Sequence, residues 1–229
     1  MSALPEIPDL TLAAIRPMPE MNFEDWFESL DQHHVKALAV LGPEPFGEAN
    51  GRTVYLAHPT AHVQAAAALC DSSAYGSTWR STRSPLVAWS NFDGLWRSPH
   101  TDWMEHWVRN GLVSMVRVEI PLPLGRAHEC FLFLDEPISS RAQAAELTYA
   151  VMGSWPLIKQ ALRVPDLGLS EKEIQSLQGA ANGMTAQQLS EHLGCAKRTI
   201  TFHWSNTRTK LRASNTMEAV SRAMLLGLI

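Results

Sequence analysis

The amino-acid sequence predicts two parts of different fold class: an α+β N-terminal domain, with an antiparallel sheet sandwiched by helices, and an all-α C-terminal domain. Two observations indicate this division. Between Val35 and Leu134, runs typical of strands alternate with helical patterns, whereas from Leu169 onward every apolar pattern has helical spacing. The length of 229 residues also allows two unequal domains.

The first elements follow from local patterns. Closely spaced prolines predict an arm over 1–20, with at most a short helical piece. We expect the next elements to be a helix at 23–30 capped by Asn22, strands at 35–41 and 53–57, and an Ala-rich helix at 61–69 capped by Thr60. Residues 71–99 lack periodicity, so we expect a loop there with one short strand at 86–89.

The second half of the N-terminal part closes the sheet and leads to a long helix. We expect a helix at 102–110 that ends at Gly111, strands at 115–120 and 129–134, and a helix from Ser139 or Ser140 to Arg163. Pro156 has no N–H and clashes with the carbonyl four residues back, so this helix should kink or break near 153–155. We therefore predict one domain at 1–163, a linker at 164–168 and a second domain at 169–229.

Charge is divided unevenly between these parts. From Leu169 onward there are seven basic and four acidic residues, a balance of +3. Of the 19 basic and 23 acidic residues in the chain, this leaves 12 and 19 in residues 1–168, a balance of −7. Only the C-terminal part is therefore expected to meet a polyanion.

Other classes of protein are disfavoured. Cys70, Cys130 and Cys195 have no C-x-x-C pair and no His at ligand spacing, which argues against a disulfide framework and a metal site. No apolar stretch is long enough to span a bilayer, and no export signal begins the chain, so we expect a soluble cytoplasmic protein. No catalytic motif or glycine-rich phosphate loop is present, so we expect neither an enzyme nor a cofactor.

The C-terminal part has the pattern of a helix-turn-helix. Helices are expected at about 170–180, 185–193, 197–211 and 216–226, and Ser170 with Glu173 and Thr185 with Gln188 form predicted capping boxes. In the third helix, the predicted recognition helix, one face carries the residues expected to be buried: Ile200, Trp204, Thr207 and Leu211. Its other side is polar and basic, which is typical of a helix that enters the major groove of DNA.

We predict that DNA is bound by polar and basic residues at the start of the second helix and along the third. They are Thr185, Lys197, Arg198, Thr201, Ser205, Arg208 and Arg212. Arg198 and Thr201 are the strongest candidates for base contacts because they lie near the start of the recognition helix. His203 is expected to be structural.

This domain resembles the DNA-binding domain of the LuxR family of bacterial transcription regulators over its full length. Leu169-Ser-Glu-Lys-Glu173 is similar to the family's Leu-Thr-x-Arg-Glu, and Arg198-Thr-Ile-x-x-His203 to its Arg-Thr-Val-Lys-x-His. The closing segment matches at Lys210-Leu211, Asn215, 218–220 and 227–229. Two departures stand out: Ala196 replaces the usual Ser, losing a cap worth about 1 kcal/mol, and Thr201 replaces a Lys, removing one phosphate charge.

The order of N-terminal elements also resembles the acyl-homoserine-lactone-binding domain of the quorum-sensing members of this family. The resemblance implies a ligand pocket, whose candidate residues are His62, Ala66, Tyr75, Trp79, Trp89 and Trp103. The family's Trp and Tyr, however, align with His62 and Ala66, and its Asp-Pro pair is missing. Without that Asp, the lactone amide is left unpaired at a cost of about 1–3 kcal/mol.

The aromatic and histidine residues of the N-terminal part also have a simpler interpretation. Its seven Trp residues could line a pocket, but we favour core packing, because aromatic side chains dominate the cores of small domains. Its His residues have no ligand spacing, so we favour surface or hydrogen-bonded roles for them.

Two hypotheses of function follow. The first is a LuxR-type transcriptional regulator that forms a homodimer through the helix at 139–163 and the last helix, and binds an inverted repeat in double-stranded DNA. It would be an orphan member that acts without an ordinary acyl-homoserine lactone or with another small-molecule signal. The alternative is an anti-activator that forms a heterodimer with a related regulator and blocks it.

Overall fold

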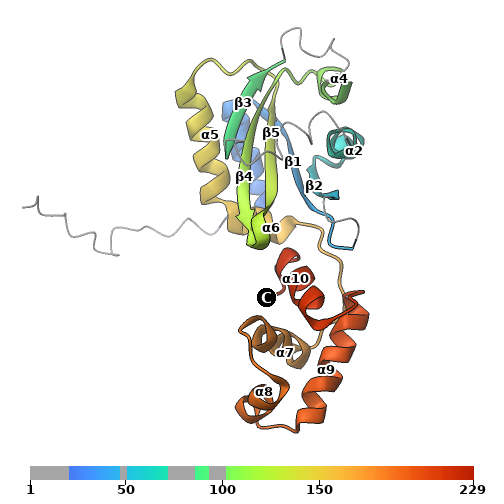
Figure 1. The fold of residues 1–229 in the computed structure, drawn as a ribbon. Coiled ribbons are helices and arrows are strands. Elements are labelled where there is room, and N and C mark those ends of the chain that lie inside the picture. The colour runs from blue at the N-terminus through green and yellow to red at the C-terminus, as the bar shows by residue number, and fades with distance from the viewer. Residues whose placement is uncertain (1–20, 47–50, 72–85, 93–101) are drawn as a thin grey trace, which may run out of the picture.

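A five-stranded antiparallel sheet forms the centre of the N-terminal part in the computed structural model, which describes residues 21–46, 51–71, 86–92 and 102–229 (Figure 1). The strand order is β2-β1-β5-β4-β3. The strands are β1 (Val35–Pro43), β2 (Arg52–His58), β3 (Val87–Asn91), β4 (Ser114–Leu122) and β5 (Arg126–Leu134). All five lie at or next to the predicted positions, so the antiparallel sheet is confirmed.

Helices cover both faces of this sheet, which produces three layers. On one face lie α1 (Phe23–Ser29), α5 (Arg141–Gly153) and α6 (Trp155–Ala161), and on the other lie α2 (Val63–Asp71) and α4 (Asp102–Val108). Side chains of β1 alternate between the two faces, so the strand contributes to an apolar cluster on each. Leu38 and Val40 belong to the cluster beneath α1, α5 and α6, and Ala39 and Leu41 to the cluster beneath α2 and α4. Both faces are therefore packed, as the predicted α+β class requires.

Short 3₁₀ turns join several elements. They are η2 (Leu30–His33), η3 (Thr60–His62) and η5 (Pro123–Gly125). The turn η3 corrects the expectation that Thr60 caps an α-helix at 61–69: Thr60 begins the 3₁₀ turn, and the α-helix starts only at Val63.

The predicted break in the long helix is present. Ser140 caps α5 by accepting a hydrogen bond from the Gln143 amide, and α5 ends at Gly153. The second segment, α6, begins at Trp155 with Pro156 in its first turn, where the missing N–H is not needed.

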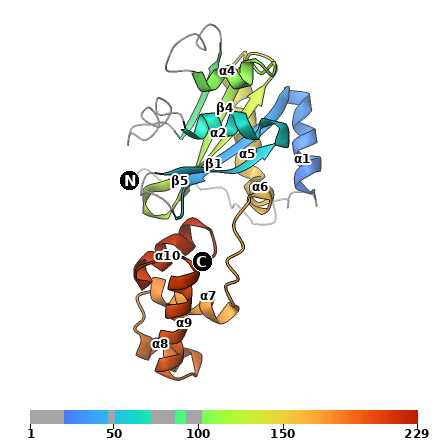
Figure 2. The ribbon, with the colours of Figure 1, turned by 90° about the vertical axis from the view of Figure 1, so that its right-hand side faces the viewer.

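Four helices follow in the C-terminal part: α7 (Glu171–Ala181), α8 (Ala186–Leu193), α9 (Lys197–Lys210) and α10 (Thr216–Leu225). Both predicted capping boxes are present. Residues 163–170, which contain the predicted linker, carry no helix or strand. In both side views, α10 is the helix of this group nearest the sheet and α8 is the farthest (Figure 2).

The first two of these helices pack closely at Gly179. A Cβ atom at this position of α7 would lie 2.5 Å from Cδ1 and 2.9 Å from Cδ2 of the buried Leu189 on α8. We expect Gly179→Val to destabilise the domain by about 1–3 kcal/mol through overpacking, measured by urea denaturation. Gly153→Ala is the matched control, since a Cβ there meets nothing within 4 Å; equal losses from both variants would contradict the prediction.

No helix of the described residues is both long and apolar enough to cross a membrane.

Candidate DNA-binding surface and signal-binding face

A sharp turn between α8 and α9 creates the helix-turn-helix. Gly194 ends α8 with a φ of 64°, in the left-handed region that glycine tolerates. The Cys195 amide donates a hydrogen bond to the Ser190 carbonyl at 3.0 Å, which closes the turn. The next helix, α9, then starts after Ala196, which makes no side-chain capping bond, as its methyl group requires.

One face of α9 is buried against the other helices. Ile200, Thr207 and Leu211 are fully buried, and the Trp204 indole Nε1 donates to the Ser176 carbonyl of α7 at 3.0 Å. This is the face that the sequence predicts to be buried. Its packing fixes the rotation of α9 about its own axis and leaves the opposite face to solvent.

The residues predicted to contact DNA are exposed or half-buried. The structure exposes Thr185, Lys197, Arg198, Thr201, Ser205 and Arg212 and half-buries Arg208. Two hydroxyls among them have local partners. The Thr185 hydroxyl takes part in the capping box with Gln188, and the Thr201 hydroxyl donates to the Arg198 carbonyl at 2.9 Å.

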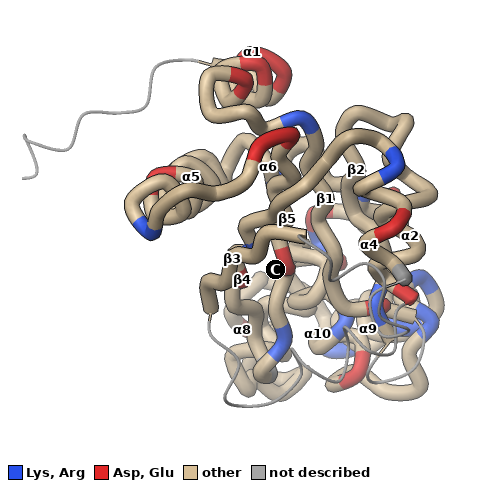
Figure 3. The backbone as a smooth tube through the Cα atoms, turned by 90° about the horizontal axis from the view of Figure 1, so that it is seen from above, with Lys and Arg blue, Asp and Glu red and all other residues tan. Residues whose placement is uncertain are grey.

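Unpaired positive charge is concentrated on α9. Lys210 forms an ion pair with Glu173, and Arg222 forms one with Glu218. By contrast, no ion pair with a described residue is formed by Lys197, Arg198 or Arg208. Figure 3 shows the basic positions of α9 and α10 in blue. Three of the five cations without such an ion pair therefore lie along the recognition helix, and Lys172 of α7 and Arg212 lie outside it.

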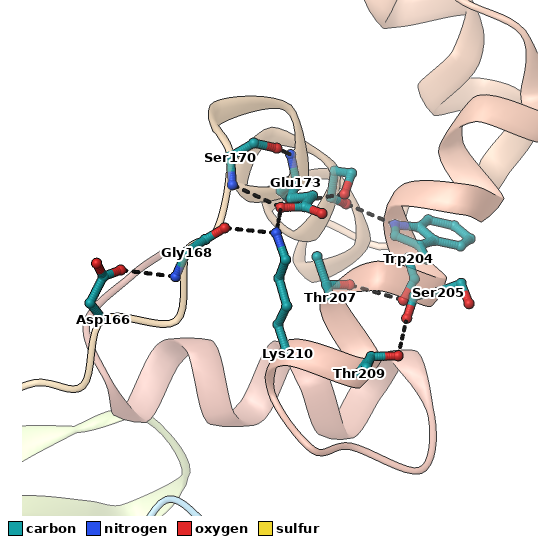
Figure 4. Close-up of polar contacts among 10 residues, drawn as sticks. Asp166, Gly168, Ser170, Glu173, Trp204, Ser205, Thr207, Thr209 and Lys210 are labelled. Atoms are coloured by element: carbon teal, nitrogen blue, oxygen red, sulfur yellow. Dashed lines mark hydrogen bonds and ion pairs between the residues drawn. The ribbon is translucent and has the colours of Figure 1, made fainter.

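Glu173 and Lys210 tie the start of α7 to the end of α9 (Figure 4). The Lys210 Nζ donates to Glu173 Oε2 and to the Gly168 carbonyl, both at 2.7 Å. Glu173 Oε2 also accepts from the Ser170 amide at 2.8 Å. Burial acts to raise the pKa of Glu173, but the hydrogen bonds from Lys210 and Ser170 outweigh it and lower the pKa to about 2.

We expect Glu173→Gln to destabilise the C-terminal domain by about 1–3 kcal/mol at pH 7, because the Lys210 ammonium loses its charged partner. The folded pKa of about 2 lies below the ordinary value of 4.5, so this stabilisation is complete above pH 4.5 and is lost as the pH falls toward 2. Urea denaturation of both proteins at several pH values should show the difference shrinking below pH 4.5. Glu191→Gln, at an exposed position of α8, is the control; a difference independent of pH would contradict this account.

Phe46, from the segment after β1, contacts the C-terminal domain. Its ring centroid lies 5.0 Å from Cζ of Arg212 and 5.9 Å from Cζ of Arg222, and the ring packs against the apolar cluster of α7 and α10. Both guanidinium groups are within range for cation–π attraction. The predicted DNA contact of Arg212 therefore has a competitor, since its guanidinium lies at the contact between the two domains.

The predicted ligand residues do not all lie on one face of the sheet. Ala66 and Trp103 are buried in the cluster beneath α2 and α4, and the His62 ring lies 5.6 Å from that of Trp107. Trp89 is partly exposed and pairs with Val116, whose side chain belongs to the α5 face. Tyr75 and Trp79 lie outside the described residues.

Two buried polar atoms on the α2 and α4 face have no hydrogen-bond partner among the described residues. Trp107 is fully buried, its ring stacks on Phe133 at 3.5 Å, and its Nε1 donates to no described residue. Its neighbour His62 has an Nδ1 that is also unpaired among the described residues, and burial lowers the pKa of His62. Trp107 was missing from the predicted ligand residues, although its position four residues after Trp103 on one helix placed it on the same side.

The same face of the sheet carries a buried charged group. Arg117 lies on β4 with Nη2 at 2.7 Å from Glu119 and 2.8 Å from Glu129, and Arg52 lies 3.1 Å from Glu129. Arg117 pairs across the sheet with Phe131 of the α2 and α4 cluster, which places both side chains on one face. This face is therefore apolar at one end and charged at the other.

Comparison with known proteins identifies the C-terminal domain. Residues 167–223 match the family described as bacterial regulatory proteins, luxR family. The transcriptional activator LuxR of Aliivibrio fischeri strain ES114 is 32% identical over 80 residues, which cover 35% of this chain and 32% of that protein. RpaR of Rhodopseudomonas palustris, a quorum-sensing-dependent regulator, is 43% identical over 61 residues, 27% of this chain and 25% of its own. The matched segments thus span about a third or less of these relatives.

The fold of nearly the whole chain, and not only of the C-terminal helices, is similar to that of a solved structure. Escherichia coli SdiA aligns with a TM-score of 0.54 and 20% identity, over 90% of this chain and 91% of its own. A second SdiA structure, in complex with octanoyl-rac-glycerol, aligns with a TM-score of 0.52 over 90% of this chain and 87% of that one. The likeness concerns both the sheet with its helices and the C-terminal helices.

Proposed function

We propose that this protein, whose residues 167–223 form a helix-turn-helix domain of the luxR family, is a transcriptional regulator that binds an inverted repeat in double-stranded DNA as a homodimer. One observation carries the proposal. The side of α9 that faces solvent carries three of the five cations of residues 169–229 that have no ion pair among the described residues, Lys197, Arg198 and Arg208, while its buried face packs through Ile200 and Trp204. This arrangement suits a recognition helix in the major groove.

Exposed apolar side chains support the dimer. Tyr149 and Met152 lie three residues apart on α5 and are 78% and 56% exposed, and Met217 on α10 is 65% exposed. These helices are the two predicted to meet a second copy. Burying such side chains would provide an apolar centre for the interface.

The test is selection of binding sites from random duplex DNA by the full chain, followed by gel shift and by light scattering to measure its mass. We expect a dimer that enriches sequences with two-fold symmetry and binds them at least about 10³-fold more tightly than random DNA. A confirmed dimer with no sequence preference at moderate salt would refute the proposal.

We further propose that the regulator acts without an ordinary acyl-homoserine lactone or with a different signal. His62 and Ala66 stand where the family places an aromatic pair. The unpaired Trp107 Nε1 and His62 Nδ1 would suit a ligand with complementary hydrogen-bonding groups.

Thermal denaturation with added ligands checks this. A bound lactone at 100 times its Kd would stabilise the protein by about 2.7 kcal/mol, a shift of about 5–10 °C for a chain of this size. We expect lactones with short and long acyl chains to shift the midpoint by less than about 1 °C. Octanoyl-rac-glycerol, seen in the SdiA complex, is the second probe; a shift of several degrees with any lactone would refute the proposal.

The alternative is an anti-activator that pairs with a related regulator. The exposed Tyr149 and Met152 on α5 would serve a heterodimer as well as a homodimer. Co-purification with a related regulator, together with no DNA binding by the homodimer, would favour this function over the first.

A further inference from the structure

The exposed face of α9 contains one large apolar side chain. Phe202 is 61% exposed, whereas Ile200 and Trp204 of the same helix pack against the other helices. Its neighbours on the helix surface are the exposed Arg198, one turn before it, and Ser205, one turn after it. Covering this aromatic ring would remove apolar surface from water, so a partner that contacts it gains binding free energy.

The polar groups beside Phe202 differ in what they can offer to a base. The Thr201 hydroxyl donates its proton to the Arg198 carbonyl at 2.9 Å and retains only acceptor capacity. Arg198 is exposed and forms no ion pair with a described residue, so its guanidinium is available for the two acceptors of guanine. Phe202 can make only an apolar contact, and the C5 methyl group of thymine is the apolar group that the major groove offers.

From this juxtaposition we propose that Phe202 is a specificity-determining residue that contacts the methyl group of a thymine in each half-site. The inference rests on the proposed DNA-binding function. Phe202 and Arg198 are four residues apart, about 6 Å along the helix axis, and successive base pairs are about 3.4 Å apart. The thymine should therefore lie within about one or two base pairs of the guanine that Arg198 contacts.

The test replaces each thymine of the selected operator by deoxyuridine, which removes only the methyl group. For the wild-type full chain, we expect a replacement in one half-site to weaken binding by about 3- to 5-fold, the value of one buried methyl group, and replacements in both half-sites by about 10- to 25-fold. For Phe202→Ala, the same replacement should change the affinity by less than about 1.5-fold. Phe202→Leu should recover part of the discrimination, because leucine retains an apolar contact.

Two controls separate the possible outcomes. Leu86→Ala removes an exposed apolar side chain, 56% exposed, from the segment before β3 and should leave the deoxyuridine effect unchanged. The inference is overturned if Phe202→Ala still discriminates between the thymine and deoxyuridine operators as the wild type does, including the case in which it binds both more weakly by the same factor. If the wild-type dimer selects no operator, the proposed DNA-binding function itself fails, and the inference fails with it.

Discussion

Arg198→Ala is expected to weaken binding to the selected operator by about 5- to 150-fold for each half-site of the dimer, equivalent to the loss of one base contact worth about 1–3 kcal/mol in each. The guanidinium is exposed in the first turn of α9 and has no ion pair among the described residues. Its removal should therefore affect DNA binding and leave the stability of the domain nearly unchanged. Binding to random DNA should fall much less, because that binding depends on total charge. Gel shifts with both DNAs at one salt concentration measure the ratio.

Arg109→Ala removes the same charge from the exposed residue that follows α4 and is the matched control. It should leave the operator affinity within a factor of about two. An equal loss of affinity for operator and random DNA with Arg198→Ala would assign this residue to phosphate contact alone and contradict a base contact.

Arg117→Met is expected to lower the stability of the N-terminal domain by about 3–5 kcal/mol. Arg117 is only 1% exposed, and its guanidinium is shared between Glu119 and Glu129. Methionine matches the length of the aliphatic stem but removes the ion-pair partner of Glu119 and one of the two arginines that contact Glu129. The loss should lower the thermal midpoint by about 6–20 °C, followed by the fluorescence of the buried Trp26, Trp103 and Trp107.

A second substitution tests the cause of this effect. Adding Glu119→Gln to Arg117→Met removes the carboxylate that pairs with Arg117 alone among the described residues and should recover part of the lost stability. Arg109→Met, at the exposed residue that follows α4, should change stability by less than about 0.5 kcal/mol. A wild-type midpoint for Arg117→Met would show that the ion pairs contribute nothing.

Features of the C-terminal domain were predictable because they depend on residues within one or two turns of each other. The capping boxes of Ser170 and Thr185 join residues three positions apart, and the buried face of α9 repeats every three or four residues. The break before Pro156 is equally local, because the proline ring clashes within its own helix. Such interactions can be recognised without knowledge of any distant contact.

Other features depended on how distant segments meet. The ion pair between Lys210 and Glu173 joins residues 37 positions apart, and Phe46 reaches Arg212 from a different domain. Trp89 was predicted to line a pocket with His62, but the register of β3 against β4 places it on the other face of the sheet. A shift by one residue reverses the face of every side chain in a strand, and the local pattern at 86–89 was too short to fix it.

The sequence by itself therefore determined the fold class, the order of the elements and the helix-turn-helix, since these follow from local periodicity, capping and turn residues. The tertiary structure alone decided which cations of the C-terminal domain stay unpaired, which side of α9 is free and where Arg117 is buried. It also decided that the Phe202 side chain is exposed to solvent, which its apolar character in the sequence does not indicate. The physical reason is that burial and pairing depend on packing between distant residues, whereas helix and turn formation depends on neighbours.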